Sequence, residues 1–398
     1  MNTKSGYPFW VVKNGLLPTY PRLERDARCD VVVIGGGITG ALVADHLSRH
    51  GHDVIVVEKR DIGWGSTAAS TALIQYEIDA HMTEIAARSD EQTAALAYTS
   101  CVSAVSQLSA LARSLRDVGF LRCDSVYLAS KERHVRDLAA EQVLRARYGL
   151  PTRMLEEAEV RDRYGVEAHA ALTTDCAAVI DPYRFTCKLL ARAHRRGVGV
   201  FDRTIVTKLE RSARGVVVRC EGDVTIRARQ VVVAAGYETQ GWLRERYARN
   251  RSTYACVSDP VDTLKPLAHT ILWETARPYH YLRTTTDHRV LVGGEDERDH
   301  PSRRDGRVAK KTRALMAYTK RLLPSMPLVP AFSWAGVFAE TPDSLPYFGS
   351  HAQYGDRVLF AMAYGGNGIT FSLLGATLLR ALIERRPHPL ARLYSFER

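Results

Sequence analysis

The chain has 398 residues, enough for two or three domains, and its 45% hydrophobic and 25% charged residues are typical of a soluble globular protein. Its seven cysteines are widely spaced and form no C-x-x-C pair, so the sequence indicates neither a disulfide framework nor a zinc site. We therefore expect reduced thiols, no metal site and a cytoplasmic protein.

The net charge of +11 raises the question of an anionic partner. Basic clusters lie at 192–197 and 300–313, so nucleic acid or an anionic membrane surface is conceivable. The chain shows neither aromatic residues interleaved with these clusters nor an RNA-binding motif. We therefore expect an Arg-rich protein without a nucleic-acid partner, and a peripheral membrane contact stays open.

The N-terminal part of the chain contains one βαβ unit and no signal peptide. Lys13, Asn14 and Pro18 interrupt the short apolar patch near the start, which is unlike a secretory signal. Residues 28–59 then follow the pattern of a strand, a glycine turn, a helix and a second strand.

The glycine turn of this unit has the spacing G-x-G-x-x-G, formed by Gly35, Gly37 and Gly40. Gly35 permits the tight turn, Gly37 lets a pyrophosphate approach the backbone, and Gly40 lets the helix pack on the sheet. The N-terminus of the helix offers free N–H groups to the anion. Glu58 closes the second strand, where its carboxylate would accept hydrogen bonds from ribose hydroxyls and repel a 2′-phosphate. The unit predicts a site for an adenine dinucleotide other than NADP.

The middle of the chain alternates helical and strand-like segments. In chain order we expect a helix at 91–118, a strand at 125–130, a helix at 131–148, a helix from Pro182 to Gly197, a hairpin leading to a buried strand at 215–236, strands at 280–287 and 289–294, and a helix around 308–323. Nucleotide-type signals at the start, middle and end imply a discontinuous cofactor domain made of 1–85, 172–245 and 331–398. Residues 86–171 and 246–330 would form a second domain.

Residues 358–379 carry no charge over a length that could span a bilayer. The Y-G-G-N-G sequence at their centre would break a membrane helix, and it suits a strand, a glycine turn and a buried helix. We therefore expect no transmembrane segment.

Two further segments favour FAD over NAD. The loop 63–79 can wrap a second phosphate and run beneath a flat ring, and its small residues are Gly65, Ser66, Thr67, Ser70 and Thr71. The apolar helix from Ile369 is preceded by Gly365, Gly366 and Gly368. A helix N-terminus in such a glycine nest stabilises the negative charge of a reduced flavin.

Together these segments resemble the FAD-dependent oxidoreductases of the D-amino-acid oxidase family, which includes glycine oxidase, sarcosine oxidase and D-amino-acid dehydrogenase. The resemblance covers nearly the whole chain, through the segments at 29–59, 65–71, 177–206, 231–239, 289–297, 338–349 and 363–370. It implies an α/β fold with a discontinuous, Rossmann-like FAD-binding domain. The inserted substrate domain would be α+β, built on a mixed or antiparallel sheet.

The resemblance also implies a reaction and a set of cofactor contacts. The reaction is oxidation of the C–N bond of an amine or amino acid of the glycine, D-amino-acid or N-methyl type, with hydride transfer to flavin N5 and an imine product. Besides the residues named above, the implied FAD contacts are Ile38, Thr39, Lys59, Val206, Ala235, Gly236, Asn367 and Thr370.

For the substrate, the resemblance to the glycine-oxidase branch points to Arg283, because a guanidinium can hold a carboxylate with two hydrogen bonds. An arginine paired at a strand edge is the alternative. Tyr281 and Tyr279 share one face of a strand and could line the pocket, with aromatic core packing as the alternative. Tyr364 could shield the flavin ring.

The chain departs from the family pattern in two places. Some relatives carry a basic residue in or just after the flavin-facing loop, where this chain has Gly366 and Thr370, which puts anchoring by a second cation in doubt. The monomeric sarcosine-oxidase type bonds a cysteine to the flavin ahead of T-P-D. The equivalent segment here, 334–343, contains no cysteine, so we expect non-covalent FAD.

Three functions stay open at this point. The first is an amine or amino-acid oxidoreductase that passes electrons to oxygen or to a quinone or carrier protein. The second is a flavin-dependent tRNA-modifying enzyme. The third is a partner-dependent flavoprotein subunit without small-amine activity of its own.

Overall fold

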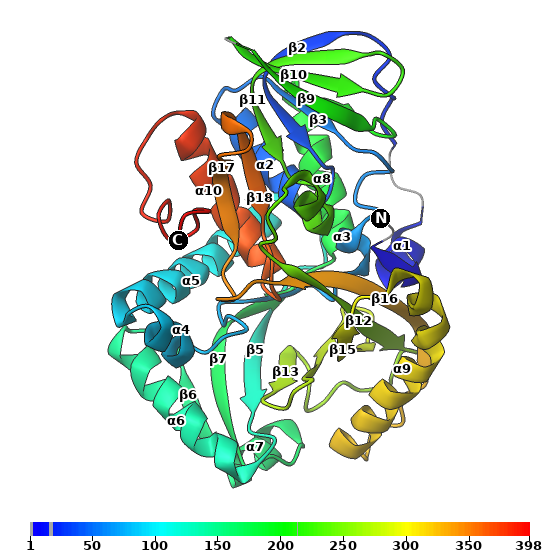
Figure 1. Cartoon of the computed structure of the whole chain (residues 1–398). Helices are drawn as coiled ribbons and strands as arrows, with labels where there is room; N and C mark the ends of the chain where they lie inside the picture. The colour runs from blue at the N-terminus through cyan, green and yellow to red at the C-terminus, as the bar shows by residue number, and fades with distance from the viewer. Residues whose placement is uncertain (1–2, 16–18, 213) are drawn as a thin grey trace.

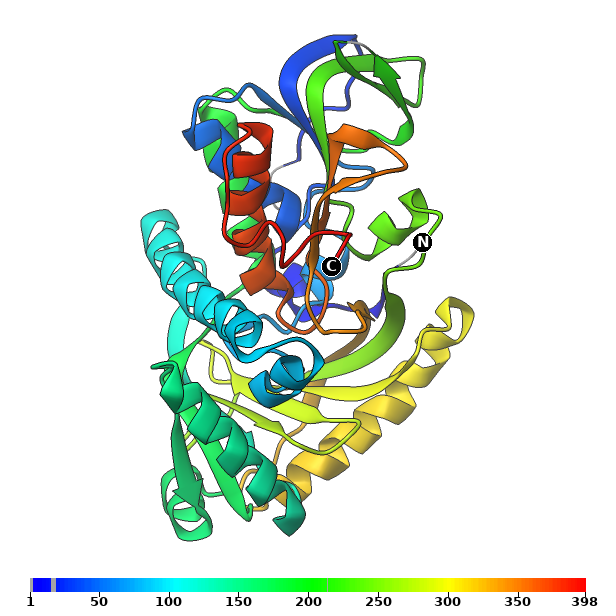
Figure 2. The same ribbon diagram turned by 60° about the vertical axis from the view of Figure 1, so that its left-hand side comes forward.

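The computed structural model describes residues 3–15, 19–212 and 214–398, so Met1, Asn2 and Pro18, which entered the predictions above, lie outside it. Within these residues the strands form two sheets, an 8-stranded sheet in the upper half of the molecule and a 10-stranded sheet in the lower half (Figure 1, Figure 2). The predicted α/β class is confirmed.

The smaller sheet has a parallel centre. In spatial order its strands are β17 (Tyr347–His351), β18 (Gly355–Met362), β11 (Thr225–Val233), β2 (Ala27–Ile34), β3 (Val54–Val57) and β8 (Gly199–Phe201). Beside this path, β10 (Gly215–Cys220) pairs with β11, and β9 (Val206–Ser212) pairs with β10. The five strands from β18 to β8 pair in parallel, and β17 closes one edge in the antiparallel sense.

Three helices, α2 (Ile38–Arg49), α8 (Pro182–Arg195) and α10 (Gly368–Ile383), pack against one another beside this sheet (Figure 1). Val31 and Val33 belong to the apolar cluster that contains these helices, whereas Val32 and Ile34 belong to a second cluster with β9–β11. Both faces of β2 are therefore buried, which explains its continuous apolar run.

The larger sheet is mixed. In spatial order its strands are β1 (Lys4–Gly6), β16 (Pro330–Glu340), β12 (Arg249–Ser258), β15 (Val290–Arg298), β14 (His280–Thr284), β13 (Thr270–Glu274), β5 (Leu121–Leu128), β7 (Ala170–Val179) and β4 (Leu73–Gln75), with β6 (Arg153–Glu156) beside β7. Neighbouring strands of this sheet are antiparallel within the described residues, except for the parallel pair β13 and β5.

The long helix α9 (Pro301–Leu322) packs on β12, β15 and β16, and α6 (Glu132–Arg147) packs on β6 and β7. The remaining helical segments are α1 (Phe9–Asn14), α3 (Ser66–Ala69), α4 (Met82–Arg88), α5 (Glu91–Leu115), α7 (Glu157–Tyr164) and the 3₁₀ segment η1 (Gly236–Trp242).

Several strands from the segments predicted to form the cofactor domain belong to the larger sheet instead. β1, β4, most of β7 and β16 fall in the segments assigned to the cofactor domain, yet all four pair within the larger sheet. β16 is the clearest case, because it pairs along its length with β12 from Arg249↔Glu340 to Ser258↔Pro330. An apolar strand pattern does not show which sheet the strand joins, so this exchange could not be predicted from local sequence.

The apolar run at 358–379 forms strand β18, a turn and the buried helix α10. Among the described residues a different helix, α5, is long and apolar enough to cross a membrane, and half of its most apolar window is buried against the rest of the protein. That is weak evidence, since the core helix of a soluble protein has the same composition. All seven cysteines are unpaired.

Candidate active site

The glycine turn joins β2 to α2 next to the end of the neighbouring parallel strand β11. Gly35 has a φ of 117°, and a Cβ there would collide with the carbonyl oxygen of Ala234, which follows β11. A Cβ on Gly40 would collide with the carbonyl oxygen of Gly35. Both positions therefore require glycine for the chain to turn this tightly and for α2 to pack this closely on the sheet.

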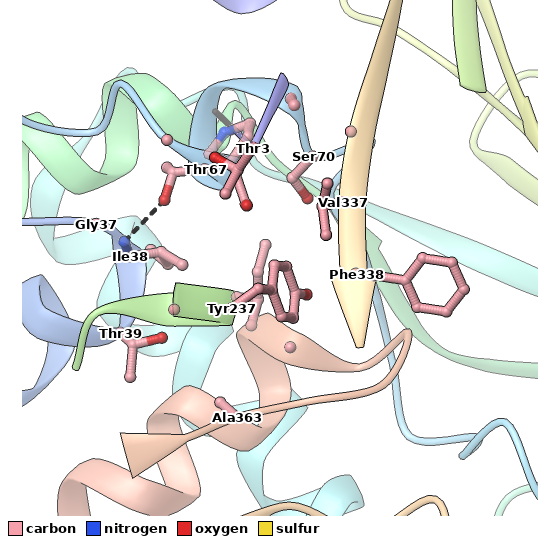
Figure 3. A pocket seen from close by; sticks show the side chains of 18 of the residues that line it. Thr3, Gly37, Ile38, Thr39, Thr67, Ser70, Tyr237, Val337, Phe338 and Ala363 are labelled. Carbon is pink, nitrogen blue, oxygen red and sulfur yellow. Dashed lines mark hydrogen bonds between the residues drawn. The ribbon is translucent and has the colours of Figure 1, made fainter. Parts of the chain in front are cut away.

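The N-terminus of α2 faces the short helix α3. Gly37 caps α2 without a side-chain hydrogen bond, and the N–H of Ile38 donates to Oγ1 of Thr67 at 3.0 Å (Figure 3). A Cβ on Gly37 would lie 3.1 Å from the same oxygen. The loop that carries Thr67 is fixed from the other side by the indole N–H groups of Trp334, at 2.8 Å from Ala69 O, and Trp10, at 2.7 Å from Ser70 O. A glycine turn and a small-residue loop thus meet, as an anion site at a helix N-terminus requires.

Glu58, at the end of β3, holds the turn as well as lining the cavity. Its carboxylate accepts the N–H of Gly36 and the N–H of Arg60, both at 2.8 Å. Burial raises the pKa of this carboxyl, and the two N–H groups oppose that shift. Beside it, Lys59 and Arg60 both pair with Glu238, which lies in η1 after the second glycine turn at Gly236.

The glycine nest before α10 is partly occupied by protein. The N–H of Gly366 donates to Oδ2 of Asp79 at 2.7 Å, and the side-chain amide of Asn367 donates to the carbonyl oxygen of Glu77 at 2.5 Å. The hydroxyl of Thr370 donates to the carbonyl oxygen of Gln75 at 3.2 Å. These bonds tie the start of α10 to the segment that follows β4.

One cavity of about 520 Å³ connects these features. Every residue predicted to contact the cofactor lines it except Gly40, which packs beneath the turn, and Thr370, which points to the backbone near β4. Tyr281 and Tyr364 line it too, and the hydroxyl of Tyr364 donates to the carbonyl oxygen of Gly236 at 3.2 Å. Figure 3 shows Thr3, Thr67 and Ser70 on one side of the open space and Tyr237 and Ala363 on the other.

Several strands of the larger sheet contribute to the cavity lining. Five lining residues on this side carry polar or aromatic side chains beyond the small-residue loop, and we call these five, Asp79, Thr253, Trp273, Tyr279 and Tyr281, the substrate end. The rings of Tyr279 and Tyr281 lie 5.8 Å apart. Burial raises the pKa of Tyr281 to about 12, and hydrogen bonds with the side chains of Thr71 and Thr253 oppose that shift. Trp273 is held by stacking on Tyr127 at 3.7 Å. The substrate end is thus an aromatic wall with one carboxylate.

The sequence profile of the DAO family, described as FAD dependent oxidoreductase, matches residues 30–382. This range includes every cavity-lining residue of the described chain except Thr3, and every described strand except β1 and the first residues of β2. The chain belongs to the DAO family. It is an FAD-dependent oxidoreductase, and FAD is its cofactor.

Two relatives align with this chain over most of their own length. The chain is 26% identical to the glycine oxidase of Geobacillus kaustophilus, over 90% of this chain and 94% of that one. It is 23% identical to the gamma-glutamylputrescine oxidoreductase of Escherichia coli, over 92% of this chain and 86% of that one. The crystal structure of the Geobacillus kaustophilus glycine oxidase superposes with a TM-score of 0.76 at 20% identity, covering 93% of this chain and 98% of that one. The fold of this DAO-family protein is therefore that of glycine oxidase.

The described residues fit FAD. Gly37 at the N-cap of α2 carries no side chain, which leaves room for a pyrophosphate beside the N-terminus of that helix. Within the described part of the chain the cavity lining contains no cysteine and no histidine, which fits non-covalent binding. When bound, FAD supplies the acceptor for a hydride, and the chain supplies position, shape and charge.

The structure does not place Arg283 where the sequence comparison predicted. Arg283 is 2% exposed and does not line the FAD cavity, and it borders a separate space of about 60 Å³. Its Nη1 donates to the carbonyl oxygens of Ala72 and Ile180 at 2.9 and 3.2 Å, and its guanidinium lies over the Trp10 ring at 4.9 Å. Tyr279 and Tyr281 both line the cavity, as the alternation of side chains along the strand predicted. Arg283 lies further along β14, past the edge of the cavity.

Several lining residues carry no local signal in the sequence. Asp79, Thr253 and Trp273 come from three segments that lie far apart in the chain. They meet because β4, β12 and β13 all belong to the larger sheet. Tyr237 and Glu238 directly follow the second glycine turn, and their position next to Gly236 could have identified them.

Proposed function

We propose that this DAO-family enzyme oxidises the C–N bond of a small amine or amino acid to an imine. The proposal is carried by one observation: a single cavity joins the FAD-binding turn to the aromatic wall of Trp273, Tyr279 and Tyr281. A substrate held against that wall shares one space with the cofactor. The sequence similarity to glycine oxidase and to gamma-glutamylputrescine oxidoreductase supports a nitrogen-bearing substrate.

The chain's own part in this reaction is to bind and to exclude water. Aromatic side chains supply a large, stiff apolar surface that displaces water from a bound ligand. Asp79 supplies the one carboxylate among the described residues of the substrate end. Little further acid–base machinery is needed, because the cofactor accepts the electrons.

The test is an anaerobic titration of the purified flavoprotein with amines, N-methylated amino acids and amino acids, one at a time. Loss of the flavin absorbance at about 450 nm with any of them supports the proposal. A flavin that none of them reduces contradicts it and favours a macromolecular substrate or a partner subunit. Readmitting air then separates an oxidase, whose colour returns quickly, from a dehydrogenase that needs another acceptor.

A further inference from the structure

The substrate end contains one carboxyl group, that of Asp79, and among its described residues there is no cation. The charged side chains that line the rest of the cavity, Glu58, Lys59, Arg60 and Glu238, cluster beside the glycine turn. Asp79 stands apart from that cluster, on the segment after β4.

Asp79 occupies the space in front of the flavin-facing loop. A Cβ on Gly366 would lie 2.5 Å from Oδ1 of Asp79, so the carboxylate fills the position that a side chain at 366 would take. Oδ2 accepts the N–H of Gly366, and Oδ1 accepts no hydrogen bond from the described residues. Burial raises the pKa of this carboxyl, while that N–H and the Arg277 guanidinium oppose the shift. The carboxylate therefore has one oxygen left for a ligand in the cavity.

A second carboxylate lies directly behind the wall. Asp296, on β15, hydrogen-bonds to Thr253, a lining residue, and its Oδ1 is buried without a hydrogen-bond partner. Burial, together with repulsion from Asp79 and Glu340, raises the pKa of Asp296 to about 6. His280 opposes that shift, and both of its ring nitrogens already contact Glu274 and Glu295 at 2.7 and 3.2 Å. A buried, unpaired carboxylate oxygen is costly, and a cation nearby lowers that cost.

The cation beside this end, Arg277, does not cancel the charge of Asp79. It is exposed, lies over the ring of Tyr279 at 5.2 Å, and donates to the backbone oxygen of Asp79 at 3.5 Å. It forms no ion pair with the Asp79 carboxylate and does not line the cavity.

We propose, on the basis of the proposed function, that the substrate end selects an ammonium group and rejects an α-carboxylate, so that the substrate class is alkylamines or diamines and not α-amino acids. An ammonium would pair with Asp79 and lie against the faces of Tyr279, Tyr281 and Trp273, which attract cations through their π-systems. An α-carboxylate at the same place would meet a like charge, and the described residues of the substrate end include no arginine or lysine to pair with it. Asp79 is the group that binds the cation, and Asp296 strengthens the negative potential behind Thr253.

The test compares two ligands that cannot be oxidised, tert-butylamine and 2-aminoisobutyrate, which differ by exchange of one methyl group for a carboxylate. Neither has a hydrogen on the carbon next to nitrogen, so binding is measured without turnover, by calorimetry and by the change in the flavin spectrum of the holoenzyme at about pH 8, where both amino groups are charged. We expect tert-butylamine to bind at least about tenfold more tightly, the effect of one hydrogen bond to a charged group.

Asp79→Asn removes the charge and keeps an acceptor for the N–H of Gly366, so it should retain FAD and abolish the preference. Asp296→Asn should weaken the preference to a smaller extent. Asp356→Asn, at an exposed position on β18, is the control and should leave the ratio unchanged.

The proposal is overturned if 2-aminoisobutyrate binds as tightly as tert-butylamine, if neither ligand binds, or if Asp79→Asn retains the preference. These outcomes are separate from failure of the proposed function, which would show as a flavin that no amine or amino acid reduces. An enzyme reduced by amino acids with reversed ligand preference would retain the function and refute the ammonium selection.

Discussion

The two ends of the FAD cavity are built in different ways. The cofactor end, around Gly35, Gly37 and Glu58, is made by the backbone of a strand, a turn and a helix that follow one another in the chain. The substrate end is made by side chains from β12, β13, β14 and the segment after β4, which meet only because their strands join one sheet. The first end depends on the absence of side chains, and the second depends on which side chains are present.

This difference shows where a family resemblance carries information about function. Backbone geometry at the cofactor end is shared by every protein that binds a dinucleotide in this way. Charge and shape at the substrate end depend on individual side chains, which the shared backbone geometry does not determine. The comparison predicts that a substitution at one end should leave the property of the other end unchanged.

The largest effect is expected at the cofactor end, from Gly37→Val. The added side chain would enter the space before the N-terminus of α2, with its Cβ 3.1 Å from Thr67 Oγ1, where the pyrophosphate approaches. We expect FAD affinity to fall by about 100-fold or more while the apoprotein stays folded. Flavin content and fluorescence titration with FAD measure it.

Gly306→Ala is the matched control, because its added Cβ on helix α9 meets no atom within 4 Å. FAD retention by Gly37→Val at the level of this control would contradict the pyrophosphate placement.

A smaller effect is expected on stability from Asp296→Asn. The pKa of Asp296 is raised from 3.8 to about 6, so the folded state favours the protonated carboxyl. The protonated carboxyl of Asp296 therefore contributes fully to the free energy of unfolding below pH 3.8. This contribution is lost as the pH rises through about 6. Asn should therefore stabilise the protein by about 3 kcal/mol at pH 8 and by only about 0.5 kcal/mol at about pH 4. Thermal unfolding at the two pH values measures this, and an equal shift at both would refute the assignment.

The double substitution Asp79→Ala with Gly366→Arg should reverse the charge of the substrate end. Gly366 has no positive φ, and the three atoms nearest to its added Cβ all belong to the Asp79 carboxylate, so removing that carboxylate relieves the closest contacts of the new side chain. Affinity for 2-aminoisobutyrate should rise by about tenfold and affinity for tert-butylamine should fall. Unchanged affinities for both ligands, with normal FAD content, would show that this position does not face the substrate.

The smallest effect is expected from Arg283→Met. Because Arg283 lies outside the cavity and its Nη1 bonds to the backbone of Ala72 and Ile180, ligand affinities should change by less than about twofold. Calorimetry with 2-aminoisobutyrate measures this. A selective loss of carboxylate binding in this variant would restore the role that the sequence comparison gave to Arg283.

The sequence predicts the cofactor end well because its determinants are local. The spacing of Gly35, Gly37 and Gly40 specifies a turn within six residues, and the same holds for the loop before α10. The sequence fails at Arg283 for a physical reason: alternation gives the face of a strand but not the point at which the strand leaves the cavity. It also fails to identify Asp79, since the contact between Asp79 and Gly366 joins positions 287 residues apart.

The most direct test of ammonium selection is anaerobic mixing of the holoenzyme with n-butylamine and, separately, with 2-aminopentanoate, which is the same amine with an α-carboxylate. We expect n-butylamine to remove the flavin absorbance at about 450 nm and 2-aminopentanoate to do so more slowly or not at all. Reduction by 2-aminopentanoate alone would contradict the ammonium-selective substrate end, and reduction by neither, nor by any other amine, would contradict the assignment of an amine oxidoreductase.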